Sequence, residues 1–523
     1  MANLKHQTLI HHFLETSAEQ FPSKIALIHE DIRATYAELN TQANHLARWL
    51  KDQKVTQGDR VVLILENSLE YVVSYYGILK AGAVAVPLST GIQPEPLGSL
   101  LKALSPKAII SSFKSERLLK ATQISSSGFK SLMLKSPKLQ WSSDACAVFP
   151  WEEHITNEFL PDPNIPIDQT ALASIIYTSG STGEPRGVML SHENIASNTH
   201  SICQYLHLTD KDIQMVVLPF FYVMGKSLLN THFAVGGTIV IHNKFAFLAS
   251  VLNQMVAENV TGFSGVPSTY AYLLHRSPLA SYKDKLGTLR YCSQAGGHMS
   301  RAIKEQLRQA LPEHTQIYIM YGATEASARL TYLEPEQFTN KMDSIGKAIS
   351  GVSIRIVDDN GKDLPPGQTG EIVATGPNIM QGYWQDPQAT ARVLAQNGYH
   401  TGDLGYRDEE GYLFTKGRRD DLLKVGGHRI NPQEIEDVLM KSNMLIEAVA
   451  LGVPDDLLGH RLVALAALKD NGCSENEILN HCAERLPKYK LPSHIKLIKA
   501  LPKGPTGKID RTRCLQLIHN KGV

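Results

Sequence analysis

The sequence predicts an α/β protein with a large N-terminal domain of mostly parallel β-sheets flanked by helices, a β-rich subdomain, and a small α+β C-terminal domain. Three observations support this fold class. The chain has 523 residues, 43% of them hydrophobic and 20% charged, which is too long for one compact core. Strand-like apolar runs alternate with helix-like segments over most of its length. From about residue 353 this alternation gives way to short strands joined by tight turns.

The alternation begins at residues 59–67, DRVVLILEN, a strand that is followed by a helix-like stretch at 69–82 and a second strand at 83–89. Further strand-like runs lie at 212–221, 236–243, 260–268, 289–297 and 315–325. Amphipathic stretches such as 249–259 and 301–311 separate most of them. Ligands of parallel sheets bind at the carboxyl ends of the strands. The polar and glycine-rich ends of these runs are therefore the candidate binding residues.

The C-terminal part has a different pattern. Asn-Gly and Pro-Pro-Gly turns join short strands just after residue 353. A glycine-rich and charged stretch then leads into a helix, for which Asn431 is the expected N-cap and Pro432 the first residue. The apolar runs beyond this helix suit a small α+β domain of roughly 100 residues. We place the boundary near residues 417–421, which divides the chain into domains 1–419 and 420–523.

The composition argues against several classes of function. The 52 basic and 51 acidic residues leave a net charge of +1, which gives no support for nucleic-acid or membrane-surface binding. The N-terminus lacks the apolar core of a signal peptide, and no apolar run is long enough to cross a bilayer. The six cysteines are scattered without a CxxC pair, which favours reduced thiols over disulfides or zinc ligands. We therefore expect a cytoplasmic enzyme with no membrane span and no nucleic-acid partner.

One loop has a composition that no hydrophobic core needs. Residues 174–192, SIIYTSGSTGEPRGVMLSH, place small hydroxyls, glycines and Arg186 after an apolar strand, and a helix capped at Ser191 follows. Such a loop can direct backbone N–H groups and hydroxyls at an anion, and the arginine adds a permanent charge, so a polyphosphate suits it. The loop lacks the GxxxxGK[ST] pattern of P-loop NTPases, and Ser/Gly-rich loops are also common as plain turns. On its own it supports both interpretations.

Four further motifs follow this loop. They are IYIMYGATEAS at 317–327, GYHTGDLGY at 398–406, KGRRDDLLKVGGHRINPQEIE at 416–436 and LPKGPTGKIDR at 501–511. With the loop they resemble the adenylate-forming superfamily of acyl- and aryl-CoA synthetases, adenylation domains of nonribosomal peptide synthetases, and luciferases. The pattern is closest to AMP-forming acyl-CoA synthetases and stand-alone acyl-activating ligases, and the resemblance covers nearly the whole chain. It implies an ATP-dependent ligase that joins a carboxylic acid to AMP, releases pyrophosphate, and passes the acyl group to a pantetheine thiol.

The resemblance also implies a site for ATP and Mg²⁺. Tyr321 would stack on adenine, Asp403 would accept hydrogen bonds from the ribose hydroxyls, and Arg418 would help hold the ribose. Thr324 would contact the α-phosphate and Glu325 would hold Mg²⁺, so both are implied as catalytic residues. The residues implied to hold the β- and γ-phosphates are Thr178, Ser179, Gly180, Ser181, Thr182, Gly183 and Arg186, the last standing where the family usually has lysine. Further implied nucleotide-binding residues are Ala295, Gly296, Gly297 and Gly322, of which the first three match the family only in their small size.

Lys508 would be the principal catalytic residue. The matching family lysine reaches from the small C-terminal domain to bridge the attacking carboxylate and the α-phosphate, where a cation cancels the repulsion between the two anions. Asp420 aligns with the family's hinge, about which the small, mobile domain rotates after adenylation. Gly427 would then border the tunnel for the pantetheine arm, and Arg429 would contact the acceptor.

Residues 216–229, VVLPFFYVMGKSLL, bear on the nature of the acid. Family members that activate amino acids carry an aspartate here for the α-ammonium group, and this stretch has no acidic residue. Tyr222 stands where many acyl-CoA synthetases have histidine. The candidate acyl pocket comprises Phe221, Tyr222, Val223, Met224, Gly225, Gly265, Val266 and Ala326, although such residues are also typical of a plain core. We expect a fatty or other aliphatic acid, with an aryl acid as the alternative.

The acceptor thiol belongs to coenzyme A or to the phosphopantetheine of a separate acyl carrier protein, since both present the same arm. Coenzyme A is favoured because it is the more frequent acceptor in the family. Two other classes of protein are alternatives to this one. A non-catalytic relative would be expected to lack Lys508 or Glu325, and both are present. A phosphotransferase that used the Ser/Thr loop would release ADP instead of AMP.

Overall fold

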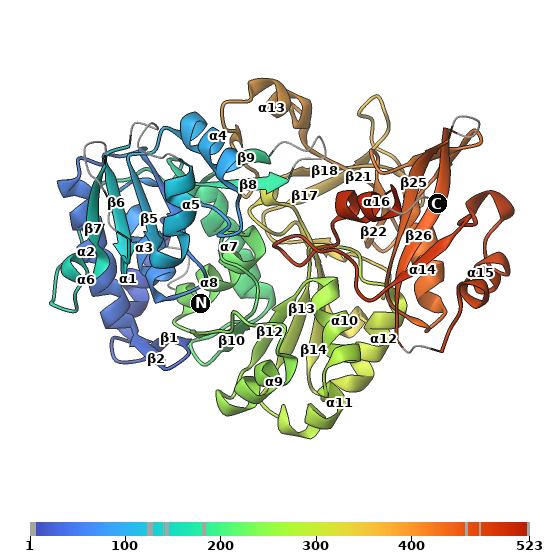
Figure 1. Cartoon of the computed structure of the whole chain (residues 1–523), viewed down its shortest axis with the longest axis horizontal. Helices are drawn as coiled ribbons and strands as arrows, with labels where there is room; N and C mark the ends of the chain where they lie inside the picture. Colours follow the sequence, from blue (N-terminus) through green and yellow to red (C-terminus); the bar gives the residue numbers. More distant parts are fainter. Residues whose placement is uncertain are drawn as a thin grey trace.

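The computed structural model describes residues 7–122, 129–139, 141, 146–179, 185–455, 459–469 and 472–519. Figure 1 shows the N-terminal strands and helices in blue and green on the left and below, and the C-terminal elements in red on the right. The C-terminal elements lie beside α10 and α12, which belong to the large N-terminal region. This junction between the two regions is where the candidate site is found.

The first of two large sheets has the strand order β19-β9-β8-β4-β3-β5-β6-β7. Neighbours from β8 to β7 pair in parallel, whereas β8 with β9 and β9 with β19 are antiparallel. The central strands are almost entirely Val, Ile, Leu and Ala because both faces of a parallel sheet are covered. The bounds are β3 (Arg60–Ile64), β4 (Val84–Pro87), β5 (Ala108–Ser112), β6 (Ser131–Lys135), β7 (Ala147–Pro150), β8 (Leu172–Ser179), β9 (Pro185–Ser191) and β19 (Gly382–Tyr383).

The second large sheet has the order β16-β15-β14-β13-β12-β10-β11-β1-β2. Its centre, from β14 to β1, is parallel, and its two edges are antiparallel. The carboxyl ends of β12, β13 and β14 therefore lie side by side and supply residues to the site. The bounds are β1 (Ile25–His29), β2 (Ile32–Thr35), β10 (Ile213–Val216), β11 (Thr238–Ile241), β12 (Gly262–Gly265), β13 (Tyr291–Gln294), β14 (Gln316–Tyr321), β15 (Thr331–Leu333) and β16 (Lys347–Ala348).

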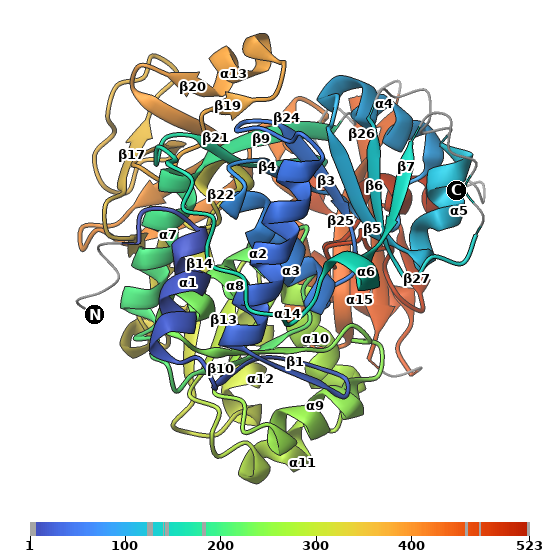
Figure 2. The same ribbon diagram turned by 90° about the vertical axis from the view of Figure 1, so that its left-hand side faces the viewer.

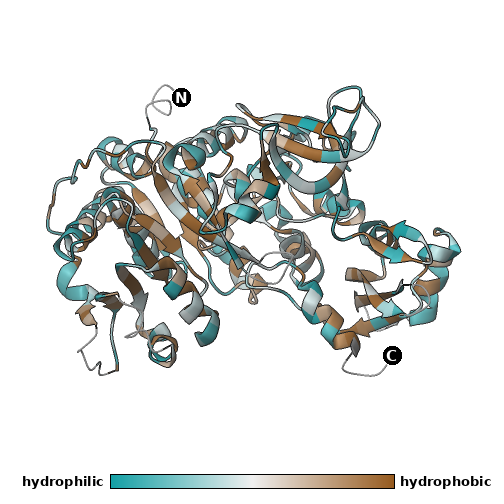
Figure 3. Ribbon diagram, turned by 90° about the horizontal axis from the view of Figure 1, so that it is seen from above, coloured by the Kyte–Doolittle hydropathy of each residue, from teal (hydrophilic) through white to brown (hydrophobic). Residues whose placement is uncertain are grey.

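A layer of helices lies between the two sheets, as Figure 2 shows, and its buried side chains form one core with the facing sides of both. Other helices cover the outer faces, so each sheet is buried on both sides. In Figure 3 the strands are largely brown, whereas the peripheral helices carry much teal on their outer surfaces. The inner helices are α1 (His11–Gln20), α2 (Tyr36–Asp52), α3 (Leu69–Lys80), α7 (His192–Tyr205) and α8 (Val223–Val235). The outer helices are α4 (Pro94–Leu104), α5 (Glu116–Ala121), α9 (Leu248–Ala257), α10 (Pro267–Arg276), α11 (Leu279–Tyr282) and α12 (Arg301–Ala310), and the four-residue α6 (Trp151–His154) packs beside β6 and β7.

The helix starts follow from capping side chains. The Ser191 hydroxyl accepts a hydrogen bond from the Asn194 amide at the start of α7, which confirms the predicted cap. Asn431 accepts one from the Gln433 amide, with Pro432 at the first position of its helix, as expected. Among the helices in the described ranges, none combines the length and the apolar character needed to span a membrane.

An antiparallel sheet forms the β-rich subdomain, and a mixed sheet with three helices forms the C-terminal part. The fold class predicted from the sequence is confirmed by this architecture, while the domain boundary near 417–421 stays a prediction. The subdomain contains β17 (Ser353–Val357), β18 (Gly370–Thr375), α13 (Pro387–Val393), β20 (Leu394–Ala395), β21 (Gly398–Arg407) and β22 (Leu413–Arg418). The C-terminal part contains β23 (Leu423–Val425), β24 (His428–Ile430), α14 (Pro432–Lys441), β25 (Leu445–Asp455), β26 (Gly459–Leu468), α15 (Glu475–Ala483), β27 (Ile495–Ile498) and α16 (Arg511–His519).

Candidate active site

A cavity of about 510 Å³ lies between the large N-terminal region and the C-terminal elements. Residues from the ends of β14, β21 and β22, from α10, and from the segment between β27 and α16 line it. The predicted site residues in its wall are Val266, Gly296, Gly297, Tyr321, Gly322, Asp403, Arg418 and Lys508. The folded chain thus gathers residues that the sequence places in separate motifs.

Tyr321, Asp403 and Arg418 form a connected group in this cavity. The Tyr321 hydroxyl donates a hydrogen bond to Asp403 Oδ2 at 2.5 Å, and Arg418 Nη1 lies 3.9 Å from Asp403 Oδ1. Asp403 and Arg418 face each other because β21 and β22 pair in register at these two positions. Burial raises the pKa of Asp403, while the Tyr321 hydroxyl and the Arg418 charge act in the opposite direction. The group fixes the aromatic ring and the carboxylate that a purine nucleoside would need.

Lys508 enters the cavity on a tight hairpin. The Gly504 amide donates to the Lys508 carbonyl at 2.8 Å, and Lys503 pairs with Ile509 across the hairpin. Lys508 Nζ lies 5.4 Å from the centre of the Tyr222 ring. The Lys508 ammonium therefore lies near a predicted acyl-pocket residue, and Lys508 lines the same cavity as the predicted nucleotide-binding residues.

Gly296 shows why a small residue is needed in the predicted adenine loop. Its φ is +86°, and a Cβ there would lie 3.1 Å from the Tyr222 hydroxyl, 3.2 Å from Val266 Cγ1 and 3.3 Å from Lys508 Cε. Gly297 also lines the cavity, whereas Ala295 is buried behind it. The glycine lets Lys508 and Tyr222 approach the loop closely.

Glu325 and Arg186 lie on either side of a residue that the sequence analysis missed, Tyr383. The Tyr383 hydroxyl donates to Glu325 Oε1 at 2.8 Å, and the Arg186 guanidinium sits 5.5 Å from the centre of the Tyr383 ring. Glu325 belongs to the short 3₁₀ helix η5 (Thr324–Ala326), in which Thr324 is buried. A carboxylate oxygen is a hard ligand that suits Mg²⁺, which agrees with the role predicted for Glu325. No sequence motif marks Tyr383, because pairing of β19 with β9 brings it here.

Strands β8 and β9 flank the predicted phosphate loop and pair in antiparallel fashion. Gly180, Ser181, Thr182 and Gly183 lie outside the described residues. On the two strands Thr178 pairs with Arg186, and Ser179 pairs with Pro185. The sequence predicted a helix capped at Ser191 after the loop, and the residues just before this helix form strand β9. The pairing of β9 with β8 therefore sets the position of Arg186, opposite Thr178.

The residues proposed for the acyl pocket divide into groups. Tyr222 and Val266 lie against Gly296 on the side of Lys508. Phe221 is half-buried, and Val223 and Met224 belong to the core between the sheets. The other three are buried in close packing: Gly225 against the Pro219 carbonyl, Gly265 against Thr269, and Ala326 in a cluster with Leu330 and Tyr399. The acyl-pocket assignment stays a prediction, with Tyr222 and Val266 close to the segment that carries Lys508.

The residues predicted for the hinge and the thiol acceptor do not line this cavity. Asp420 lies in an exposed turn after β22, and Arg429 is exposed in β24. Gly427 has φ +84° in the turn between β23 and β24, and a Cβ there would meet no atom of the described residues within 4 Å. In this arrangement of the two regions, Lys508 lines the cavity and Gly427 does not.

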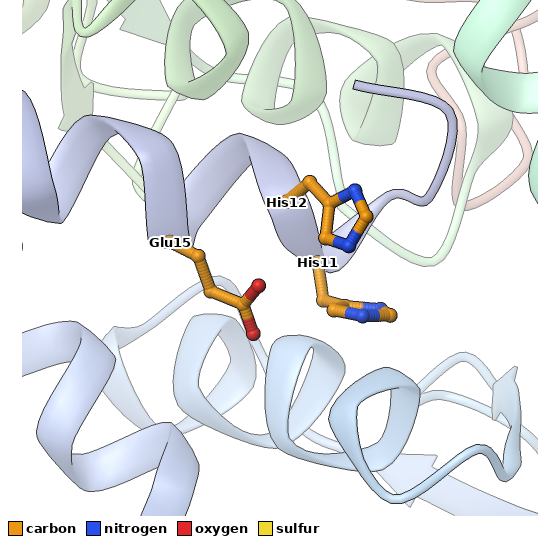
Figure 4. Close-up of side chains that lie close together, drawn as sticks. All are labelled: His11, His12 and Glu15. Carbon is orange, nitrogen blue, oxygen red and sulfur yellow. The ribbon is translucent and has the colours of Figure 1, made fainter. Parts of the chain in front are cut away.

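Figure 4 shows a separate group of side chains on α1, His11, His12 and Glu15. Within the described residues it is the group of potential metal ligands whose donor atoms lie within 4.8 Å of one another. Lys80 is buried beside it, with Nζ 2.6 Å from Glu15 Oε1 and 2.6 Å from Asp162 Oδ1. Because this ammonium already holds the carboxylates and would repel a second cation, we interpret the cluster as an ion-pair network that ties α1 to α3.

Comparison with known proteins agrees with this geometry. The family described as "AMP-binding enzyme" matches residues 14–384, and the family "AMP-binding enzyme C-terminal domain" matches residues 434–508. The long-chain-fatty-acid–CoA ligase of Bacillus subtilis (strain 168) is 31% identical over 533 residues, which covers 96% of this chain and 93% of the relative.

Two solved structures resemble the whole chain. The anthranilate CoA ligase AuaEII in complex with anthranoyl-AMP has a TM-score of 0.87 and 25% identity, and the match covers 97% of each chain. The o-succinylbenzoate coenzyme A synthetase MenE of Bacillus subtilis in complex with ATP and magnesium has a TM-score of 0.80 and 28% identity over 96% of this chain and 98% of the other. The names of these three relatives specify different acids.

Proposed function

The chain belongs to the AMP-binding enzyme family, and on that premise we propose that the cavity between its two regions adenylates a carboxylic acid and that the acyl group then passes to coenzyme A. The observation that carries the proposal is the position of Lys508. A hairpin from the C-terminal part brings this cation into the cavity that also holds Tyr321, Asp403 and Arg418. Adenylation requires nucleotide-binding residues and a mobile positive charge in the same cavity.

In the first step, a carboxylate oxygen attacks the α-phosphorus of ATP and the bond from that phosphorus to the pyrophosphate oxygen breaks. Acyl-AMP and pyrophosphate are the products. Both reactants are anions, so the chain must align them while it neutralises their charge. Lys508 supplies a cation between carboxylate and α-phosphate, and Arg186 supplies a second one for the far phosphates. Glu325, held by Tyr383, would bind the Mg²⁺ that neutralises the remaining phosphate charge.

In the second step, the sulfur of the thiol attacks the acyl carbon. The bond between that carbon and the phosphate oxygen breaks, AMP leaves with the electron pair, and the thiol proton is released to solvent. Asp420 is our proposed hinge for the rotation that withdraws Lys508 and brings Gly427 and Arg429 to the site. Coenzyme A is the acceptor that we propose, and a separate carrier protein is the alternative with the same pantetheine arm.

We propose a fatty or other aliphatic acid as the substrate. The stretch 216–229 offers no carboxylate for an α-ammonium group, and Val266 beside Lys508 is fully buried and apolar. The Bacillus subtilis relative is named for long-chain fatty acids, which agrees with this choice. An aryl acid is the alternative, since the structural neighbour AuaEII holds anthranoyl-AMP.

A panel of acids with detection of AMP and pyrophosphate tests the proposal. Fatty and aliphatic acids of several chain lengths, aryl acids and amino acids would each be incubated with ATP and Mg²⁺. We expect pyrophosphate and AMP with aliphatic acids, and a thioester by mass spectrometry when coenzyme A is added. Turnover with amino acids alone would overturn the substrate class, and release of ADP would overturn the chemistry. Parallel incubations with coenzyme A and with a phosphopantetheinylated carrier protein decide the acceptor.

We also propose that the enzyme works in the cytoplasm. All six cysteines are free thiols, and five of them are buried. Unpaired thiols are typical of a reducing compartment.

A further inference from the structure

One face of α10 contacts the segment that carries Lys508. Ser268, Tyr272 and Arg276 are spaced four residues apart, so they lie on the same side of the helix. Ser268 Oγ donates to the Gly507 carbonyl at 2.6 Å, and Arg276 Nη2 donates to the Lys499 carbonyl at 3.4 Å. The third contact joins Tyr272 to Lys503. All three contacts link the large N-terminal region to the C-terminal part.

Of these three contacts, the one between Tyr272 and Lys503 involves both the hydroxyl and the ring of the tyrosine. Lys503 Nζ donates to the Tyr272 hydroxyl at 2.6 Å and also lies 3.8 Å from the centre of its ring. The same ammonium forms an ion pair with the buried Glu447 at 2.8 Å. Glu447 also accepts a hydrogen bond from the Leu501 amide at 3.0 Å, which anchors the start of the hairpin. The carboxylate holds the ammonium within the C-terminal part, and the tyrosine holds it from across the junction.

These contacts hold the hairpin at Lys503 and at Gly507. Lys503 pairs with Ile509 across the hairpin, and Gly507 directly precedes Lys508. Gly507 has φ +81°, so its carbonyl direction depends on a backbone conformation that Ser268 secures from outside. A small rotation of this hairpin would displace the Lys508 ammonium at the end of its long side chain. Positioning of a catalytic charge to within about 1 Å has large effects on rate.

We propose that Tyr272 is a positioning residue for adenylation: with Ser268 it forms the surface of α10 on which the Lys508 hairpin docks. This inference rests on the proposed function and adds to it the contact that sets the position of the catalytic cation. The Lys503–Glu447 pair lies wholly in the C-terminal part, so it persists when that part moves. The bonds from Tyr272 and Ser268 must break before the second step, and Tyr272 therefore acts on the first half-reaction only.

The test is the variant Tyr272→Phe, which keeps the ring under the Lys503 ammonium and removes the hydroxyl. We expect the single-turnover rate of acyl-AMP formation at saturating ATP and acid to fall about tenfold, the scale for one charge-assisted hydrogen bond. Thioester formation from supplied acyl-AMP should stay unchanged or become faster, and the melting temperature should not change. Ser268→Ala should act in the same direction. Tyr282→Phe, which removes another hydroxyl from α11 of the same region, should affect neither step.

A second readout separates positioning from a general structural role. In a Lys508→Ala background, Tyr272→Phe should cause no further loss of adenylation, because the residue acts through the missing lysine. An equal tenfold loss in that background would overturn the inference. Equal effects on both half-reactions would overturn it as well.

Hydrogen exchange of residues 502–510 distinguishes failure of this inference from failure of the proposed function. We expect faster exchange in Tyr272→Phe and Ser268→Ala than in the wild type or Tyr282→Phe. This measurement needs no acid substrate, so it stays informative if the acid panel gives no AMP. Unchanged exchange in both variants would show that the hairpin does not dock on α10.

Discussion

Lys226 is a buried lysine that forms no ion pair within the part of the chain that the structure describes. It is 2% exposed, its Nζ donates to Ser174 Oγ at 3.3 Å, and it lies 4.7 Å from the centre of the Tyr75 ring. Burial lowers the pKa of Lys226 from 10.5 to about 7. Lys226 lies in the first turn of α8, which begins directly after Tyr222. The Tyr222 backbone carbonyl accepts a hydrogen bond from the Lys226 amide. The sequence alone shows a lysine in an apolar stretch, and only the fold shows that its ammonium stays inside.

The variant Lys226→Met should be more stable than the wild type, and the gain should depend on pH. Below about pH 7 the lysine is charged in both the folded and the unfolded chain, and folding must bury the charge. Between the folded pKa of about 7 and the unfolded 10.5, only the unfolded chain binds the proton, so wild-type stability rises with pH. We expect a gain of about 1–4 kcal/mol near pH 6 that shrinks near pH 9. Denaturant unfolding at both pH values measures it. A loss of stability, or a gain independent of pH, would contradict this account.

Tyr383 leads to a prediction about magnesium. Tyr383→Phe keeps the ring under Arg186 and removes the hydroxyl that donates to Glu325. Without this partner the Glu325 carboxylate is less well oriented, and the Mg²⁺ concentration for half-maximal adenylation should rise about tenfold. Saturating Mg²⁺ should restore most of the rate. Tyr406→Phe, whose ring stacks on Phe414 in the β-rich subdomain, is the matched control. A fall in rate that Mg²⁺ does not relieve would assign Tyr383 to another role.

The residues that the sequence predicted were those inside local motifs. Tyr321, Asp403, Arg418 and Lys508 each stand in a run of several recognisable residues, so their common cavity could be anticipated. Tyr383 and Tyr272 could not, because each reaches its partner through pairing or packing of distant segments. A single tyrosine with no motif around it gives no signal of that kind.

At the level of elements, the alternation of strands and helices was predictable and some connections were not. The strand expected at 59–67 is β3, and the strand expected at 83–89 is β4. No strand was predicted between the phosphate loop and the helix capped at Ser191, yet residues 185–191 pair with β8 and β19 as strand β9. Its partner β19 comes almost two hundred residues later in the sequence, and such long-range pairing leaves no local pattern.

The variant Gly225→Ala tests whether close backbone packing sets the position of the first turn of α8. A Cβ at this position would lie 2.2 Å from the Pro219 carbonyl oxygen and 2.9 Å from that of Leu218. Both atoms are backbone, so Gly225→Ala must shift the first turn of α8 and with it Tyr222. We expect a loss of about 1–3 kcal/mol of unfolding free energy and a higher KM for the acid. In Gly98→Ala, within α4, the new Cβ would lie 3.6 Å from Thr122 Cγ2 and meet no other described atom within 4 Å, so stability should rise slightly. Equal effects of the two variants would show that the close contact does not matter.

At the scale of the whole molecule, the structure holds one of the two arrangements that the proposed reaction needs. Lys508 lies in the cavity, Ser268 and Tyr272 hold its hairpin, and His298 Nε2 lies 2.7 Å from Asp437 Oδ1 across the same junction. Each of these contacts would have to break for the C-terminal part to turn. The sequence could predict that such a part exists, since its patterning changes, but its packing on α10 and α12 depends on surfaces formed only after folding.

Lys508→Ala should separate the two half-reactions. Adenylation should fall by about 10²-fold or more, because the transition state loses a preorganised cation. Thioester formation from supplied acyl-AMP should survive, since Lys508 is withdrawn in that step. Pyrophosphate release and mass spectrometry of the thioester measure the two rates. If both fell equally, or neither fell, the role assigned to Lys508 would be wrong.

Gly427→Trp should have the opposite effect, and the present arrangement explains why. A Cβ at this glycine would meet no described atom within 4 Å, so we expect a large side chain to be tolerated there while Lys508 occupies the cavity. Adenylation should therefore stay within about twofold of the wild-type rate. After rotation the same side chain would fill the proposed pantetheine tunnel, and thioester formation should fall by about 10²-fold.

The positive φ of Gly427 makes a control necessary, because any side chain there costs about 1–2 kcal/mol of backbone strain. Gly58→Trp provides it, since Gly58 has φ +82° and open space around it in the turn before β3. Comparable melting temperatures for the two variants, with loss of thioester formation only in Gly427→Trp, would place the obstruction at the acceptor site. Loss of both half-reactions in Gly427→Trp but not in Gly58→Trp would mean that Gly427 already contributes to the first step. It would contradict the proposal that one arrangement serves adenylation and the other serves thioester formation.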